Sequence, residues 1–528
     1  MNLAALLTLF SWFVVPPPVP PPPRPKLVVV ITVDQLRPDY FTRWKSQLTG
    51  GLAQLANEGA FFTEAYQDHA ITETAPGHST ILSGMWPAHT GIIRNSEGVQ
   101  DSLAPLLRTT GPGASPRRFR GTTLVDWLKA SDPTARALSV SRKDRGAILP
   151  LGRAKEQVYW YQSGLFTTSR YYADTLPSWV QAFNARRLPF KAASTTWTLL
   201  LPDSLYKEPD NEPWENGGND IAFPHRLPAD SIQASLAIAG VPAMDSLTLL
   251  FALDGFEALR LGRKGTDLLA VSLSTTDAVG HAYGPDSREI HDQVLRLDRY
   301  LGWFLKRLTD RVGRDNVVVV LTADHGVTSY PERTRAKTGG AAYRVLLDTM
   351  ITAVNRDLDR VAGAGAPPRA WLDFDTGMLF LRDNGRLAAL GVKTDSVLDA
   401  LVARIVRVPG VARVIKPADL GRADTASDPV ARRWIHQLPP DAGVVLTVTL
   451  QPGSVWDIPN LPIAMHGQPS DDDSHVPIIF WGRGVRRGAF AGRMNTVDIA
   501  PTLGVLLGVT PLSLVDGHAR TDALGPRN

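Results

Sequence analysis

Four short apolar runs, separated by long stretches of chain, constrain the fold more than any other feature of this sequence. They are rich in β-branched residues and cover Leu27–Val33, Leu268–Leu273, Val317–Leu321 and Val476–Trp481. Continuous apolar runs of this length are typical of strands buried on both faces, as in a parallel sheet. Arg288–Asp310 has apolar side chains at helical spacing, and Thr496–Leu507 resembles another helix start. The pattern predicts an α/β fold with a largely parallel central sheet flanked by helices.

The intervals between these runs are long enough to hold inserted structure. The first interval contains aromatic- and proline-rich stretches at Tyr159–Tyr172 and Pro202–Pro224. Its length predicts an inserted cap or subdomain around residues 150–260 rather than a plain crossover. A second insertion, with a small α/β pattern of its own, is predicted around residues 337–452. We therefore expect one catalytic domain over residues 26–528 that carries both insertions.

The N-terminal residues 1–25 differ in composition from the rest of the chain. Leu3–Val15 is an uncharged apolar run of the length of a signal-peptide core, and it is too short to span a bilayer comfortably. The proline-rich Val15–Pro25 that follows predicts a stiff polyproline spacer. No basic residue precedes the run and no small-residue cleavage site follows it, so a membrane-anchor fragment or a misassigned start stays open. We expect this segment to direct export, which would make the protein periplasmic or secreted.

Composition excludes several classes of function. The sequence has no cysteine, which excludes a disulfide scaffold, thiolate metal sites and a cysteine-derived nucleophile. Its 56 basic and 52 acidic residues give a net charge of +4, which is too balanced to argue for a nucleic-acid partner. The small basic excess suits an anionic substrate. No stretch after the N-terminal segment has the apolar length of a membrane span, so none is expected in the folded domain.

Carboxylate and imidazole side chains stand beside all four predicted strands. Asp34 follows the first strand, Asp277 and His281 follow the second, Asp324 and His325 follow the third, and His475 precedes the fourth. Open α/β sheets bind ligands at the carboxyl ends of their parallel strands, so these side chains should converge. Carboxylate together with neutral imidazole is a ligand mixture that suits Zn²⁺. The combination predicts a metal site, although each residue alone has a structural interpretation such as a helix cap.

Six other histidines have no such setting and are predicted to be structural or surface residues. They are His69, His89, His225, His291, His436 and His518.

Thr74 is a candidate nucleophile. Pro76 and the helical stretch after it mark a helix start, so Thr74 lies at or just before a helix N-terminus. Such an end carries free backbone N–H groups and the positive end of the helix dipole, which together favour a phosphate group. A metal ion that lowers the pKa of a hydroxyl makes it an effective nucleophile. From this motif alone, a plain N-cap would be the better interpretation of Thr74.

Read together, five segments resemble the alkaline phosphatase superfamily, and within it the PafA-type alkaline phosphatases with a threonine nucleophile. They are TVDQLRPDY, TETAPGHSTILSGMWPAHTGIIRN, STTDAVGHAYGP, TADHG and DDDSHVPIIFWG, and the similarity runs from about Lys26 to about Leu507. The resemblance implies an alkaline-phosphatase-like fold with two zinc ions per chain. Asp277, His281 and His475 would hold one ion, and Asp34, Asp324 and His325 would hold the other. Thr74 would bind metal as an alkoxide and become a covalent phosphothreonine.

The resemblance also implies a phosphate-binding set. Asn95 matches an asparagine that donates to a phosphoryl oxygen, and Lys143 and Arg145 match the K-x-R pair that holds the non-bridging oxygens. Nucleotide pyrophosphatase/phosphodiesterases share the zinc ligands and the threonine but lack this pair. A lysine and a bidentate arginine match the extra charge of a monoester dianion. The resemblance therefore implies a zinc-dependent phosphomonoester hydrolase acting on small phosphate monoesters, with a phosphodiesterase of the same superfamily as the alternative.

Overall fold

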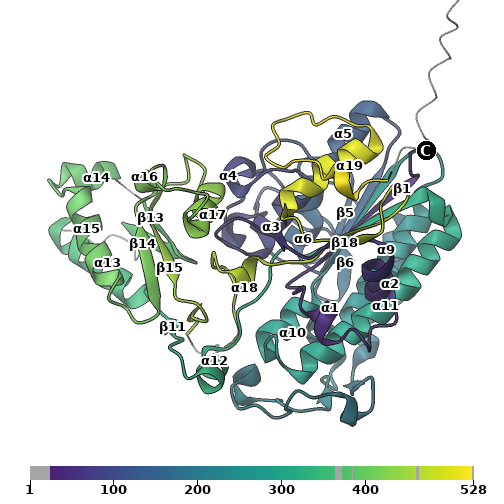
Figure 1. Cartoon of the computed structure of the whole chain (residues 1–528), viewed down its shortest axis with the longest axis horizontal. Coiled ribbons are helices and arrows are strands. Elements are labelled where there is room, and N and C mark those ends of the chain that lie inside the picture. The colour runs from purple at the N-terminus through teal and green to yellow at the C-terminus, as the bar shows by residue number, and fades with distance from the viewer. Residues whose placement is uncertain (1–23, 363–370, 383, 460–462, 526–528) are drawn as a thin grey trace, which may run out of the picture.

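The computed structural model describes residues 24–362, 371–382, 384–459 and 463–525, which form a larger and a smaller lobe (Figure 1). The larger lobe is built on a sheet that has nine strands within these residues. In spatial order the strands are β18 (Gly488–Phe490), β2 (Ala60–Phe62), β17 (Ile478–Gly482), β10 (Val317–Thr322), β1 (Leu27–Val33), β9 (Asp267–Leu273), β4 (Ala137–Ser141), β5 (Gln157–Gln162) and β6 (Leu165–Thr167).

The centre of this sheet is parallel. β1 pairs in parallel with β10 on one side and with β9 on the other, and β4 pairs in parallel with β9 and β5. The predicted α/β fold with a largely parallel sheet is confirmed. β17, the fourth predicted strand, differs because it runs antiparallel to β10. An antiparallel strand that is buried on both faces has the same apolar composition, so the sequence pattern could not reveal its direction.

The reversal of β17 matters for the site. Because β17 runs against β10, the residues that precede β17 lie at the edge of the sheet where β10 ends. Gly326, just after β10, accordingly donates its backbone N–H to the carbonyl oxygen of Asp473, at a distance of 2.7 Å. The loop before β17 and the loop after β10 therefore pack against each other.

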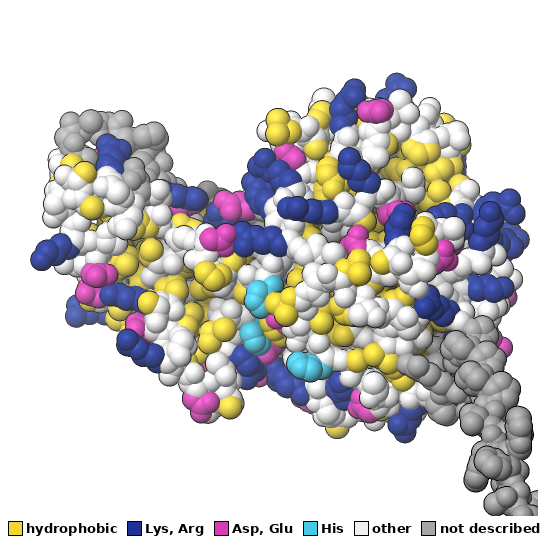
Figure 2. Space-filling model, turned by 90° about the horizontal axis from the view of Figure 1, so that it is seen from above, with side chains coloured by type: hydrophobic (Ala, Val, Ile, Leu, Met, Phe, Trp, Pro, Cys, Tyr) yellow, Lys and Arg dark blue, Asp and Glu magenta, His cyan; other side chains and the backbone are white. Residues whose placement is uncertain are grey.

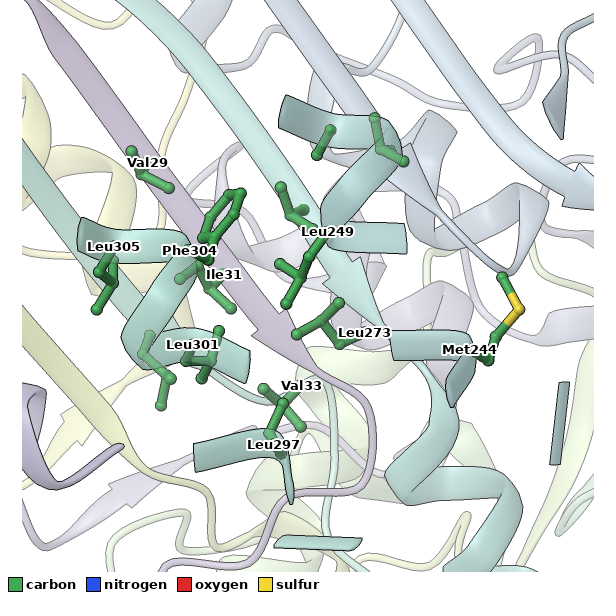
Figure 3. Packing of buried hydrophobic residues seen from close by; sticks show 14 of the residues in the cluster. Val29, Ile31, Val33, Met244, Leu249, Leu273, Leu297, Leu301, Phe304 and Leu305 are labelled. Atoms are coloured by element: carbon green, nitrogen blue, oxygen red, sulfur yellow. The ribbon is translucent and has the colours of Figure 1, made fainter. Parts of the chain in front are cut away.

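Helices cover both faces of the sheet, which explains why its central strands are predominantly apolar. Figure 3 shows Val29, Ile31 and Val33 of β1 meeting side chains of α9 (Ala243–Ala258) and α11 (Arg288–Val312). The alternate side chains of β1, Val28 and Val30, belong to a second buried cluster on the opposite face with α5 (Leu124–Ser131) and α19 (Ile499–Leu507). The two predicted helices are found as α11 and as the 496–507 segment that contains α19.

The smaller lobe, in green in Figure 1, has its own sheet and its own core. The sheet has the spatial order β12 (Leu372–Asp375), β13 (Met378–Leu381), β15 (Val444–Leu450) and β14 (Val411–Ile415). Its larger helices are α13 (Asp348–Ala362), α15 (Thr394–Ile405) and α17 (Pro429–Gln437). These elements lie almost wholly within the stretch 337–452 that was predicted as the second insertion. The turn between β12 and β13 reaches the larger lobe, where Thr376 Oγ1 donates to Glu73 Oε1 at 3.0 Å.

Two expectations from the sequence concern membranes: the N-terminal apolar segment, and the lack of a spanning stretch in the folded domain. The apolar run Leu3–Val15 and most of the proline-rich stretch lie outside the described residues. Among the described helices, no single one is long and apolar enough to cross a membrane. The pair Ser231–Gly240 and Ala243–Ala258 meets the length and composition only when both are joined across a bend of 92°.

Candidate active site

The ends of four neighbouring strands place charged side chains at one edge of the sheet. Asp34 follows β1, Asp324 follows β10, and Lys143 follows β4. After β9 the chain enters α10 (Thr275–Tyr283), whose first and last turns carry Asp277 and His281. These two residues are four apart and share a helix face, so Asp277 Oδ1 lies 3.2 Å from His281 Nε2.

Two groups of three side chains here could hold a metal ion. One consists of Asp277, His281 and His466, and the other of Asp34, Asp277 and His325; within each group the ligand atoms lie within 4.8 Å of one another. Asp324 lies beside the second group, with its Oδ2 atom 3.8 Å from His325 Nε2. Of the six predicted protein ligands, the structure therefore brings five together, and it adds His466.

The backbone holds all three imidazoles in the same tautomer. The Nδ1 atoms of His281, His325 and His466 lie 2.6, 2.9 and 2.7 Å from the carbonyl oxygens of Ala464, Gly326 and Thr72. A carbonyl oxygen can only accept a hydrogen bond, so Nδ1 carries the proton in each ring and Nε2 presents its lone pair. This is the arrangement found around metal-bound histidines, where the outer hydrogen bond fixes the ring orientation.

His475 is a correction to the sequence analysis. Its Nε2 atom lies 2.7 Å from the carbonyl oxygen of Thr63, and its ring stacks on Tyr66 with centroids 4.8 Å apart. It belongs to neither metal-ligand group, whereas His466 Nε2 lies 3.5 Å from Asp277 Oδ1. The prediction favoured His475 because it immediately precedes a strand. His466 lies in a loop, where its ring is placed by the contact of its Nδ1 with Thr72, which is distant in sequence.

The electrostatics of the cluster fit a cation. Within the described residues, Asp34 Oδ1 and His325 Nε2 are buried with no hydrogen-bond partner. The Nε2 atoms of His281 and His466 lie 3.2 Å apart, so two lone pairs face each other unless a proton or a metal ion stands between them. Burial raises the pKa of Asp34, and the neighbouring charges of Asp277 and Asp324 raise it further. Buried carboxylates and neutral imidazoles in this arrangement are suitable ligands for zinc.

Lys143 is the cation that the chain itself supplies to this cluster. Its Nζ atom lies 2.6 Å from Asp34 Oδ2, 2.7 Å from Asp277 Oδ2 and 3.1 Å from Thr74 Oγ1. Burial opposes the ionisation of Asp277, yet the charges of Lys143 and His281 hold the pKa of Asp277 well below its usual range. The lysine thus connects the candidate nucleophile to the candidate metal ligands.

Thr74 is the first residue of α3 (Thr74–Ile81), as predicted, and it is buried. α3 packs directly on the end of β10, because a Cβ atom at Gly77 would lie 2.1 Å from the carbonyl oxygen of Asp324. His78 completes the contact, with Nδ1 2.9 Å from the carbonyl oxygen of Thr74 and 3.1 Å from Asp324 Oδ2. The helix N-terminus is therefore held against the strand end that carries Asp324 and His325.

Asn95 and Arg145, the other predicted phosphate-binding residues, lie on separate elements near α3. Asn95 Oδ1 accepts the backbone N–H of Ala75 at 2.8 Å, and Asn95 donates its own N–H to Glu73 Oε2 at 2.8 Å. Arg145 lies in the first turn of α6 (Asp144–Ile148), with its guanidinium 3.6 Å from Asp144. No hydrogen bond or ion pair joins Arg145 to Thr74 in the described part of the chain, so its role stays a prediction.

The six histidines predicted to be structural belong to neither metal-ligand group among the described residues. His291 stacks on Trp44 and His436 stacks on Trp86, with centroids 4.4 and 4.3 Å apart. Figure 2 shows histidine side chains on the surface where the two lobes meet, so exposed imidazoles accompany the buried ones at this junction.

Comparisons with known proteins agree with this fold. Residues 28–353 match the model of the type I phosphodiesterase / nucleotide pyrophosphatase family, and the chain belongs to that family. Among curated relatives, alkaline phosphatase PhoV of Synechococcus elongatus is 34% identical over 95% of this chain and 93% of its own length. Alkaline phosphatase PhoK of Sphingomonas sp is 33% identical over 94% of this chain and 90% of its own length.

Solved structures share this fold. The crystal structure of alkaline phosphatase PafA matches with a TM-score of 0.87 and 29% identity, covering 95% of this chain and 99% of PafA. Murine ectonucleotide pyrophosphatase / phosphodiesterase 5 matches with a TM-score of 0.54 and 15% identity, which is a likeness of fold only. The resemblance to PafA-type alkaline phosphatases inferred from the sequence motifs is confirmed.

Proposed function

We propose that this protein is a zinc-dependent phosphomonoester hydrolase, an alkaline phosphatase that works through a covalent phosphothreonine at Thr74. The observation that carries the proposal is the position of Thr74 Oγ1. It lies at the N-terminus of a helix, 3.1 Å from the Lys143 ammonium, which in turn contacts two of the candidate metal ligands. The names of the full-length relatives support the same activity.

Two zinc ions per chain are part of the proposal. Asp277, His281 and His466 would hold one ion, and Asp34, Asp324 and His325 would hold the other. Bound zinc would lower the pKa of the Thr74 hydroxyl and neutralise charge on the leaving oxygen. The outer hydrogen bonds from each imidazole to a backbone carbonyl support this assignment, because they leave three Nε2 lone pairs for metal.

The chemistry consists of two displacements at phosphorus. In the first, Thr74 Oγ1 loses its proton and forms a bond to phosphorus while the bond to the ester oxygen breaks, and the leaving oxygen takes up a proton to depart as the alcohol. In the second, a water molecule loses a proton as its oxygen attacks phosphorus, the bond to Thr74 Oγ1 breaks, Thr74 regains a proton, and inorganic phosphate is released. The transition states of such reactions are loose, so positioning and charge stabilisation dominate. Lys143, Arg145, Asn95 and the N-terminus of α3 would provide both for the non-bridging oxygens.

A comparison of substrates tests the reaction class. Zinc-loaded protein should hydrolyse p-nitrophenyl phosphate with a higher kcat/KM than bis-p-nitrophenyl phosphate, and acid quenching should trap phosphate on Thr74. A preference for the diester would instead establish the phosphodiesterase alternative. Trapping on another residue, or full activity with less than one metal ion per chain, would refute the mechanism.

We also propose that the protein acts in the periplasm or outside the cell. The support is the apolar run Leu3–Val15 and its proline-rich continuation. Fractionation of cells that produce the full sequence, with mass spectrometry of the N-terminus, tests the proposal. Activity confined to the cytoplasmic fraction would refute it.

A further inference from the structure

Two carboxylates outside the active site are buried with oxygen atoms that have no hydrogen-bond partner among the described residues. Glu215 begins the short helix η5 (Glu215–Gly218), and Glu289 lies in the first turn of α11. Each is 1% exposed. Both oxygens of Glu215 and the Oε2 atom of Glu289 have no hydrogen-bond partner among the described residues. An ionised carboxylate buried in this way is strongly destabilised unless a proton or a cation compensates its charge.

The surroundings of these two carboxylates are predominantly acidic. His225 Nε2 lies 3.1 Å from Glu289 Oε1, and His225 Nδ1 lies 3.2 Å from Asp220 Oδ2. The imidazole therefore contacts Oε1 of Glu289, and the other oxygen, Oε2, is the one without a partner among the described residues. Burial and, after it, the charge of Glu289 raise the pKa of Glu215 to about 9. Glu215 and Glu289 are therefore close enough to repel each other when both are ionised.

The nearby basic side chains already have acidic partners. Arg333 lies 3.8 Å from Glu212, and Arg288 lies 3.7 Å from Asp210. Asp210 and Glu212 belong to the same loop as Glu215 and add to the negative charge around it. Among the described residues, the five carboxyl groups of this cluster thus face three basic side chains; the acids are Asp210, Glu212, Glu215, Asp220 and Glu289, and the bases are Arg288, Arg333 and His225.

The same loop, DNEPWENGGND over residues 210–220, carries many oxygen donors. Its backbone is tightly coiled, with positive φ at Asn216, Gly217 and Gly218. Such a loop offers carbonyl and amide oxygens that neighbour Glu215 in the chain. The two groups of three His, Asp or Glu ligands found among the described residues are both in the active site. The loop cluster is therefore rich in oxygen but lacks the ligand set of another zinc site.

We propose that Glu215 and Glu289 are carboxylate ligands of a calcium ion, completed by oxygen atoms of the loop 210–220 and by water. Calcium takes six to eight oxygen ligands in flexible geometry, which suits a loop of this kind better than the strict octahedron of magnesium. The ion would neutralise the two carboxylates and hold the loop against the junction of α10 and α11.

This position connects the proposed ion to the active site without placing it there. The Tyr283 hydroxyl, at the end of α10, donates to the carbonyl oxygen of Asp220 at 3.2 Å. Trp214 of the loop packs against a small cluster that contains Tyr330, and the Tyr330 hydroxyl donates to the carbonyl oxygen of His281 at 3.1 Å. Calcium would therefore stabilise the support of α10, the helix that carries Asp277 and His281, and would not touch the substrate.

Calcium content and thermal stability of the zinc-loaded full chain test the proposal. After desalting into calcium-free buffer with zinc present, elemental analysis should find about one calcium per chain. Added CaCl₂ should raise the Tm, because a ligand that binds only the folded state stabilises it. Glu215→Gln keeps the side-chain shape without the charge and should lose both effects while zinc content stays unchanged. Glu257→Gln, at an exposed carboxylate paired with Arg311, is the matched control and should behave like wild type.

A measurement in calcium-free buffer separates a calcium ligand from a buried neutral acid. There the Tm of Glu215→Gln should equal or exceed that of wild type, because the variant has no charge to neutralise. If Glu215→Gln fails to fold, Glu289→Gln and the wild-type calcium titration decide the question. A wild-type protein that holds no calcium and whose Tm ignores CaCl₂ would overturn the proposal, and so would a full calcium response in a folded Glu215→Gln variant.

Discussion

The structure replaces His475 with His466 among the candidate metal ligands, and a matched pair of variants tests this change. In His466→Ala the first ligand group loses one of its three side chains, namely the imidazole whose Nε2 lies 3.2 Å from that of His281. Loss of an outer-shell partner alone costs 10–100-fold in metal affinity in typical sites, so loss of a direct ligand should cost at least about 100-fold, or roughly 3 kcal/mol. His475→Ala removes one hydrogen bond to Thr63 and a ring stack on Tyr66, so we expect a loss of only about 1 kcal/mol in stability.

Zinc competition against a coloured chelator measures the affinity of each variant, and kcat is measured with and without excess zinc. His466→Ala should hold one zinc ion weakly and recover part of its activity when zinc is added. His475→Ala should hold both ions like wild type and keep its kcat. The reasoning fails if His475→Ala loses zinc while His466→Ala retains both ions, because the ligand set would then be the one that the sequence motif implied.

Three further predictions concern the nucleophile, the phosphate-binding pair and a buried acid. Thr74→Ala should lose nearly all turnover with both metals bound, whereas Thr74→Ser should stay active; metal analysis and kcat check this, and an active alanine variant would contradict it. The double variant Lys143→Ala/Arg145→Ala should lose about 10²–10³-fold in kcat/KM on a monoester and less on a diester, and equal losses would show that the pair does not set the preference. Burial raises the pKa of Asp473 from 3.8 to about 7, so the folded state favours its protonated form and the contribution of this group to stability falls as the pH rises through that range. Asp473→Asn cannot ionise, so its Tm relative to that of wild type should increase between about pH 4 and pH 7. The corresponding gain in relative free energy of unfolding is as much as roughly 2–4 kcal/mol, and a Tm difference that stays constant over this range would refute the assignment.

The parts of the fold that sequence patterns predicted are those whose environment is uniform. β1 was predicted at the residues where it is found, because both of its faces are buried and every position is apolar or β-branched. β4 was missed: it lies in the same sheet, but its polar Ser139 and Ser141 interrupt the apolar run. The direction of β17 could not be read, since strand direction depends on which neighbour it pairs with rather than on composition.

The candidate site shows the same contrast between residues placed by local structure and residues placed by long-range contacts. Asp34, Asp277 and Asp324 could be predicted as candidate ligands because each lies within a few residues of a strand end, so the sheet largely determines their position. His466 was missed because nothing local marks its loop; its ring is oriented by the carbonyl oxygen of Thr72, almost four hundred residues earlier in the chain. Metal ligands that depend on long-range contacts of this kind become visible only when the loops are seen side by side.

The contact between the β12–β13 turn and Glu73 has a consequence for how this chain can change over time. Glu73 precedes Thr74, the candidate nucleophile; its side chain accepts the N–H of Asn95 and the hydroxyl of Thr376 from the smaller lobe. A shift at the tip of this turn is therefore transmitted to the residues that would bind phosphate. The helices α13 and α15 pack in the smaller lobe's own core and can accept substitutions that preserve it. Mutational tolerance within this one lobe should accordingly be graded, lowest at Thr376 and highest at the helices farthest from it.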